Sequence, residues 1–73
     1  MHKTHVVAGR TSALEEAIRR VRAEFVEMPG MQLTPAQAAR LWHFEPEFCD
    51  AVLRALVDRK FLVKTRHEKF ARA

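Results

Sequence analysis

The segment LTPAQAARLWHFEPEFCDAVLRALVDRKFL, residues 33–62, contains two helix starts in quick succession. In the first, Thr34 precedes Pro35 and is followed at the third position by Gln37. This is a capping box with proline at the first helical position. In the second, Glu45 precedes Pro46, so a potential cap residue again stands directly before a proline. The segment therefore predicts two helices that follow one another closely along the chain.

We place these helices at residues 35–42 and 46–60. The short link between them leaves room only for a sharp turn, so the pattern predicts a helix-turn-helix. Trp42 and Cys49 are interpreted as core residues, in preference to a ligand-stacking aromatic and a nucleophile or metal ligand. The predicted buried faces are Ala38, Leu41 and Trp42 in the first helix, and Phe48, Cys49, Val52, Leu53 and Leu56 in the second.

A further helix is predicted over residues 13–28, after a capping box that begins at Ser12. Pro29-Gly30 ends it, and residues 1–10 before it are expected to form a flexible arm. On its polar face we expect the ion pairs Glu15–Arg19 and Glu16–Arg20, and the basic cluster there is interpreted as solvated. Its predicted buried stripe is Leu14, Ala17, Ile18, Val21, Phe25 and Met28.

Three short segments favour β structure. Residues 31–33 could form an edge strand, and residues 61–65 carry the β-prone run FLVKT. Residues 70–72 could return antiparallel after a loop at 66–69. This loop contains no glycine or asparagine, so a loop of four residues fits better than a tight two-residue turn.

Three helices, a short strand and a terminal hairpin together resemble the winged helix-turn-helix superfamily of bacterial transcription regulators. The resemblance covers residues 12–72 and rests on the segments 33–41, 52–57 and 61–65. It implies a mainly α domain at residues 11–73 with a small β-hairpin, whose loop is the wing. It also implies that the third helix enters the major groove of DNA.

The chain departs from the superfamily pattern at two positions. The turn between the two helices of the motif often holds a glycine with positive φ, and here His43 or Phe44 must adopt that conformation. The cap of the third helix is Glu45, which is a weaker cap than Asp, Ser or Thr.

Composition bounds the remaining possibilities. The chain has 73 residues, a net charge of +4 and one cysteine. We expect one small cytoplasmic domain without an internal disulfide or a membrane-spanning segment. No phosphate-cradling glycine loop, catalytic triad or metal-ligand spacing is present in the sequence. We therefore expect neither an enzyme nor a cofactor or metal.

The charge is unevenly distributed. Residues 45–58 carry one arginine against four acids, a net charge of −3, whereas residues 59–73 carry six cations against one acid, a net charge of +5. Phosphate neutralisation supplies most of the affinity for DNA. Binding to double-stranded DNA should therefore be led by the wing, and the predicted contacts are Gln37, Arg40, Arg54, Lys64, Arg66, His67 and Lys69.

The alternative is a protein-interaction module. It would use the acidic outward face of the third helix, at Glu47, Asp50 and Asp58, against a basic protein surface. We expect a monomer or a weak homodimer, and a third possibility is self-association through the arm at residues 6–8.

Overall fold

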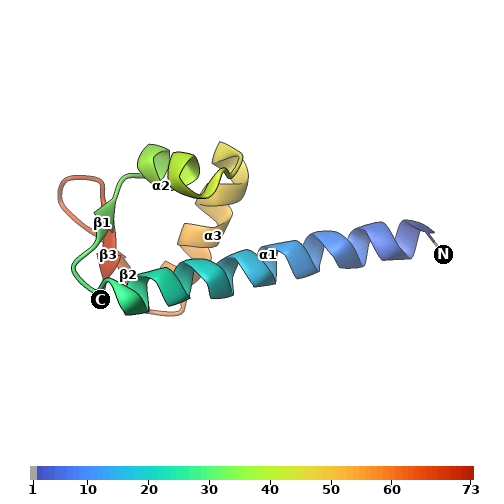
Figure 1. Cartoon of the computed structure of the whole chain (residues 1–73), viewed down its shortest axis with the longest axis horizontal. Helices are drawn as coiled ribbons and strands as arrows, with labels where there is room; N and C mark the ends of the chain where they lie inside the picture. The colour runs from blue at the N-terminus through green and yellow to red at the C-terminus, as the bar shows by residue number, and fades with distance from the viewer. Residues whose placement is uncertain (1) are drawn as a thin grey trace.

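The computed structural model describes the backbone of residues 2–73 and the side chains of residues 13–73. Figure 1 shows one long helix, two shorter helices above it and a small sheet beside its C-terminal end. The chain is mainly helical, with a three-stranded antiparallel sheet. The elements are α1 (His2–Glu27), β1 (Gln32–Leu33), α2 (Pro35–Trp42), α3 (Pro46–Asp58), β2 (Leu62–Lys64) and β3 (Phe70–Arg72).

The predicted start of the first helix is wrong, because α1 begins at His2 and not near Ala13. Ser12 therefore lies within α1 and does not cap it. A serine inside a helix can point to solvent or bond to the carbonyl four residues earlier, so the sequence pattern of a capping box alone cannot distinguish a helix start from an interior turn. The predicted flexibility of residues 1–10 stays a prediction, and the side chains of residues 1–12 lie outside the described part.

The start of α2 is confirmed. The Gln37 N–H donates to Thr34 Oγ1 at 3.1 Å, and the Thr34 N–H donates to Gln37 Oε1 at 2.9 Å. α2 ends at His43, whose φ of 57° is left-handed, and the Phe44 N–H closes the turn by donating to the Ala39 carbonyl at 2.9 Å. The expectation that a non-glycine residue makes this turn is thereby confirmed.

The sheet has the order β1-β3-β2, with β3 in the centre. Gln32 pairs with Ala71 on one side of β3, and Val63 pairs with Ala71 on the other. The β2–β3 loop, residues 65–69, is one residue longer than predicted because Thr65 lies in it. The Thr65 N–H donates to the Lys69 carbonyl at 2.6 Å, which closes the loop.

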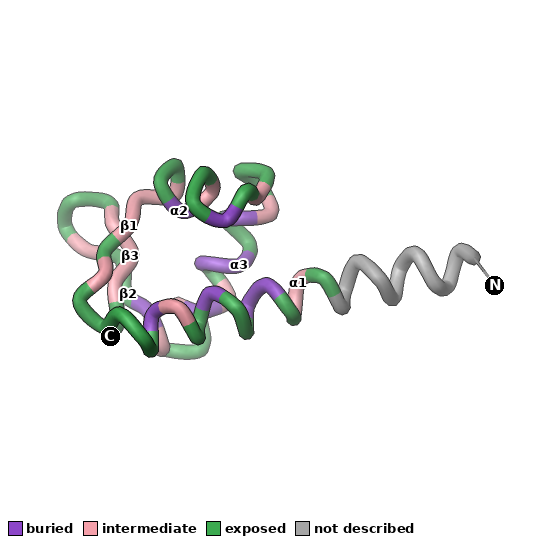
Figure 2. Tube along the Cα trace, viewed as in Figure 1, coloured by how far each residue is buried: buried purple, intermediate pink, exposed green. Residues whose placement is uncertain are grey.

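The core lies where α1, α2, α3 and β2 meet, and Figure 2 shows the buried positions on the facing sides of the helices. Leu41 was expected in this core but is 50% exposed. Trp42 follows it directly and is buried, and successive helical residues cannot both point the same way. Met28 is likewise 49% exposed, because α1 ends at Glu27. The buried residues are Ala17, Ile18, Val21, Phe25, Ala38, Trp42, Cys49, Val52, Leu53, Leu56 and Leu62.

The ion pairs predicted along α1 are not formed in the described part of the chain. Glu15 instead pairs with Arg59, at 3.6 Å between Oε2 and Nη2. Arg20 lies over the Phe44 ring, with its Cζ 6.0 Å from the centroid. Glu15 and Arg20 therefore contact neighbouring elements and do not form the predicted pairs along α1.

Candidate nucleic-acid interface

The predicted DNA-contacting residues come from three neighbouring parts of the fold. Gln37 and Arg40 lie on the exposed side of α2, and with Leu33 and Leu41 they line a shallow depression. Arg54 of α3 and Lys64 of β2 line a second groove, of about 400 Å³. The structure thus brings Arg54 of α3 and Lys64 of β2 to one groove. They are ten positions apart in the sequence, which gave no indication that they would lie together.

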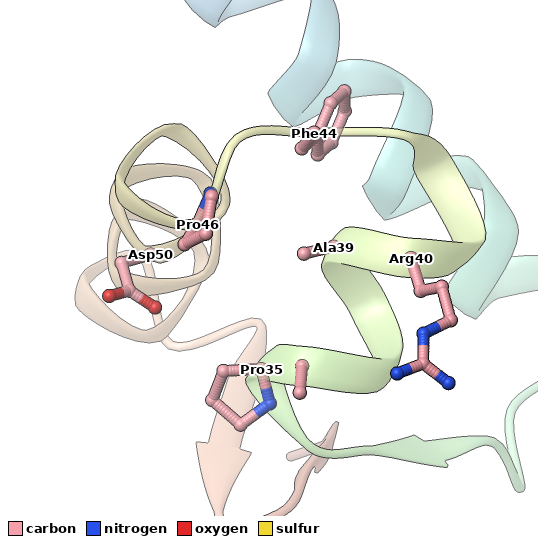
Figure 3. Close-up of a pocket in the computed structure, with 7 residues that line it drawn as sticks. Pro35, Ala39, Arg40, Phe44, Pro46 and Asp50 are labelled. Atoms are coloured by element: carbon pink, nitrogen blue, oxygen red, sulfur yellow. The ribbon is translucent and has the colours of Figure 1, made fainter.

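A third groove, of about 470 Å³, lies between α2 and α3. Figure 3 shows Arg40 projecting from α2 and Asp50 from α3 at its two sides, with Phe44 in the link above. The groove is lined mostly by apolar side chains. They are contributed by Pro35, Ala36, Ala39, Phe44 and Pro46.

Aromatic packing fixes the orientation of α3 relative to the other helices. The Phe25 and Trp42 centroids are 6.3 Å apart, and the Trp42 and Phe44 centroids are also 6.3 Å apart. Phe44 then meets Phe48 edge-on at 5.1 Å. These tilted and edge-to-face contacts are the favoured aromatic geometries. They connect α1 to the link and to the first turn of α3, and thereby hold the grooves in place.

The β2–β3 loop presents a mixture of paired and exposed charge. Lys64 Nζ lies 3.0 Å from Glu68 Oε1 and 6.0 Å from the Phe70 centroid, so part of its charge is compensated. Arg66 and His67 are exposed, and Arg66 has no ion-pair partner within residues 13–73. Lys69 is half-buried, and its N–H donates to Thr65 Oγ1 at 3.2 Å. Arg66 is therefore the most available cation of the loop.

The outward face of α3 is acidic, as predicted. Glu47, Asp50 and Asp58 are all exposed, and Arg54 is the cation among them. Glu47 occupies the first turn, where a carboxylate is favoured by the partial positive charge of the helix N-terminus. The position of Glu47 therefore has a structural explanation in addition to any role in binding.

Cys49 is a core residue, as predicted. It is 1% exposed, and its Sγ lies 3.9 Å from the Pro35 carbonyl oxygen. Burial, and secondarily the charge of Asp50, raise the pKa of the Cys49 thiol above its ordinary value. A neutral, buried thiol is a poor nucleophile. Within the residues whose side chains are described, no group of histidine, cysteine and acidic residues could hold a metal ion.

Sequence reasoning missed a second group of cations, around Phe61. Arg22 of α1 and Arg72 of β3 both stack on the Phe61 ring, at 4.9 and 4.5 Å from Cζ to the centroid. The three residues are far apart in sequence. Only the packing of α1 shows that Arg22 lies against Phe61, just after the end of α3. The nearest sequence signal is the spacing of Glu15 and Arg22, which puts both on one side of α1.

The helices that the structure describes include none with the length and apolar character needed to cross a bilayer. No family model, curated protein or solved structure matches this chain.

Proposed function

We propose that the domain is a winged helix-turn-helix that binds double-stranded DNA through the β2–β3 loop and the adjoining cations of α2 and α3. The observation that supports this most directly is the groove shared by Arg54 and Lys64. Two exposed cations from different elements line this concave surface together with the Asp50 carboxylate, and Arg66 is exposed in the loop that follows Lys64. Such a surface suits a phosphate backbone, which supplies most of the affinity of DNA-binding proteins.

In this proposal, the phosphate contacts come from Arg54, Lys64, Arg66 and Lys69, and the exposed His67 lies next to Arg66 in the loop. Gln37 and Arg40 lie at the edge of the DNA on the α2 side. The acidic first turns of α3 keep that helix from approaching the phosphates closely. The protein would then act as a small regulator-like DNA-binding protein of the cytoplasm, reading shape and backbone more than base edges.

The test is reversal of charge in the β2–β3 loop. The Arg66→Glu/Lys69→Glu variant should bind a short duplex at least tenfold more weakly than the unaltered protein. The slope of log K against log salt should become shallower by about two, because each lost phosphate contact removes about 0.9 from it. Fluorescence anisotropy between low and physiological salt measures both quantities.

The matched control is Arg20→Glu, which reverses a charge on α1, outside the β2–β3 loop. It should alter affinity only slightly. Equal binding by the loop variant and the unaltered protein would remove the loop from the proposed interface.

A specific observation also favours a second candidate function, the docking of a protein. The 470 Å³ groove is mostly apolar and has the Asp50 carboxylate at its side. Apolar grooves suit a helix that carries apolar anchors, and Asp50 on one side and Arg40 on the other would pair with opposite charges on that helix. Reversal of Glu47, Asp50 and Asp58 to lysine should abolish such docking, whereas the loop variant should leave it intact.

A further inference from the structure

A cluster of cations gathers around the link between α3 and β2. We call it the Phe61 cluster, and it comprises Arg22, Arg59, Lys60, Phe61 and Arg72. The four cationic side chains are exposed, and the phenylalanine is half-buried between them and the core. Arg22 and Arg72 are held against the same ring, at 4.9 and 4.5 Å. The two guanidinium carbons are therefore at most 9.4 Å apart, the sum of their distances from the ring centroid.

Like charges gathered on one part of the surface repel each other, and contact with an aromatic ring compensates only part of that repulsion. Neither Arg22 nor Arg72 has an ion-pair partner within residues 13–73. Glu15, the one carboxylate shown to contact the cluster, is engaged by Arg59 at 3.6 Å. The cluster therefore carries a clear positive excess, and an anion bound at its exposed guanidinium groups would compensate that charge.

The geometry of guanidinium narrows the class of anion. A planar fork of donors matches the oxygens of a phosphate, and stacking on an aromatic ring fixes the plane of the fork in advance. Lys60 directly precedes Phe61 in the chain, is exposed and has a left-handed backbone with φ 63°. Exposed cations contributed by α1, the α3–β2 link and β3 fit a repeating chain of phosphates better than a single small molecule.

This cluster is separate from the β2–β3 loop. Arg72 pairs with Leu62 at one end of the hairpin, whereas Lys64 pairs with Phe70 at the other end. Figure 1 shows the link that enters β2 lying beside α1, while the loop extends from the opposite end of the sheet. A phosphate chain bound at the loop would therefore contact different residues from a phosphate chain bound at the Phe61 cluster.

We propose that the Phe61 cluster is a second phosphate-contacting surface, which binds the phosphodiester backbone of duplex DNA independently of the β2–β3 loop. The choice of DNA rests on the proposed function, whereas the position of the surface rests on the packing of Arg22 and Arg72. Each of these two arginines contributes one contact to the salt dependence of binding.

The test uses the full chain and a duplex of about 20 base pairs, a length on the scale of two helical turns. Arg22→Gln/Arg72→Gln should weaken binding fivefold to twentyfold and make the salt slope shallower by about two. Arg20→Gln is the matched control, because it removes another ring-stacked arginine of α1 that lies over Phe44. It should leave both quantities unchanged. Arg22→Lys/Arg72→Lys keeps the charges but removes the planar forks, so it should keep the salt slope of the unaltered protein and recover only part of the affinity.

A thermal melt first establishes that each variant is folded. If the double glutamine variant does not fold, Arg72→Gln at the end of the hairpin replaces it, and the expected change in slope is then about one. Combination of Arg22→Gln/Arg72→Gln with Arg66→Glu/Lys69→Glu should multiply the two losses, because separate surfaces contribute independently.

Each outcome decides the proposal. Unchanged affinity and slope in the folded glutamine variants would overturn the Phe61 cluster while leaving the loop in place. Loss in those variants, with no loss in the loop variant, would confirm the cluster and refute the loop. Failure of the unaltered protein to bind DNA even at low salt would overturn both. Equal competition by inorganic phosphate and by the duplex, at matched phosphate concentration, would refute a surface built for a phosphate chain.

Discussion

Left-handed backbone at non-glycine residues marks the direction changes of this fold. In the described part of the chain, His43, Lys60 and Glu68 have φ values of 57°, 63° and 62°. At Lys60 the hydrogen bonds complete a Schellman motif. The Phe61 N–H donates to the Leu56 carbonyl and the Lys60 N–H to the Val57 carbonyl, both at 2.9 Å. Glycine is the usual residue at this position because it has no Cβ to strain.

Lys60→Gly should therefore stabilise the protein. A non-glycine residue in the left-handed region costs about 1–2 kcal/mol, and glycine returns part of this through its larger entropy in the unfolded chain. We expect a net gain of about 0.5–1 kcal/mol in the free energy of unfolding, measured by urea titration. The neighbouring change Arg59→Gly is the control. Its φ is −84°, so glycine brings no relief there and should destabilise the fold.

Cys49 makes stability depend on alkaline pH. Burial raises the pKa of its thiol in the folded state, so the folded protein keeps the proton at pH values where the unfolded chain begins to lose it. The contribution is complete below the pKa of the unfolded thiol, about 8.5, and is lost as pH rises above it towards the folded value. The urea concentration at the unfolding midpoint should decrease as the pH is raised from 8 to 10. In Cys49→Ala this component of the decline should be missing, and an identical decline in both proteins would contradict the assignment.

At the scale of elements, the features predicted best are those set by neighbouring residues. The capping box at Thr34 and the turn at His43 each depend on side chains within a few positions, and both are confirmed. The start of α1 was predicted wrongly. The capping-box pattern at Ser12 indicated a helix start there, but α1 extends back to His2. Leu41 and Trp42 compete for one direction on α2, and only the packing against Phe25 decides between them.

The two helix starts of the α2–α3 pair differ in quality, which gives a prediction about α3. Glu45 has the extended conformation of a cap, φ −63° and ψ 144°, but its side chain makes no capping hydrogen bond. Aspartate keeps the charge and has the shorter reach that the cap geometry needs. Glu45→Asp should raise the free energy of unfolding by about 0.5–1 kcal/mol. Thr34→Ala, which removes an existing capping box from α2, should lower it by about 1 kcal/mol. Equal stability of Glu45→Asp and the unaltered protein would show that Pro46 alone sets the start of α3.

The basic character of the candidate site could be predicted from the sequence, but the positions of its cations in the fold could be predicted only in part. The charge count placed the basic excess in residues 59–73. It could not show that these cations divide between the β2–β3 loop and the Phe61 cluster, because the hairpin register and the packing of α1 separate them. The groove shared by Arg54 and Lys64 likewise depends on how α3 meets the sheet.

At the scale of the whole molecule, the acids of α3 distinguish the two candidate functions. Under the DNA-binding proposal, Glu47 and Asp50 lie near approaching phosphates and oppose them. A unit charge about 7 Å from a phosphate in water contributes about 0.6 kcal/mol. Removal of both charges is worth about 1.2 kcal/mol, so Glu47→Gln/Asp50→Asn should tighten DNA binding about sevenfold, while leaving the salt slope almost unchanged because no phosphate contact is added. Asp58→Asn, at the other end of α3, is the control and should have a smaller effect. Unaltered DNA affinity in the double variant, together with loss of binding to a basic, apolar peptide helix, would instead assign the α3 face to protein docking.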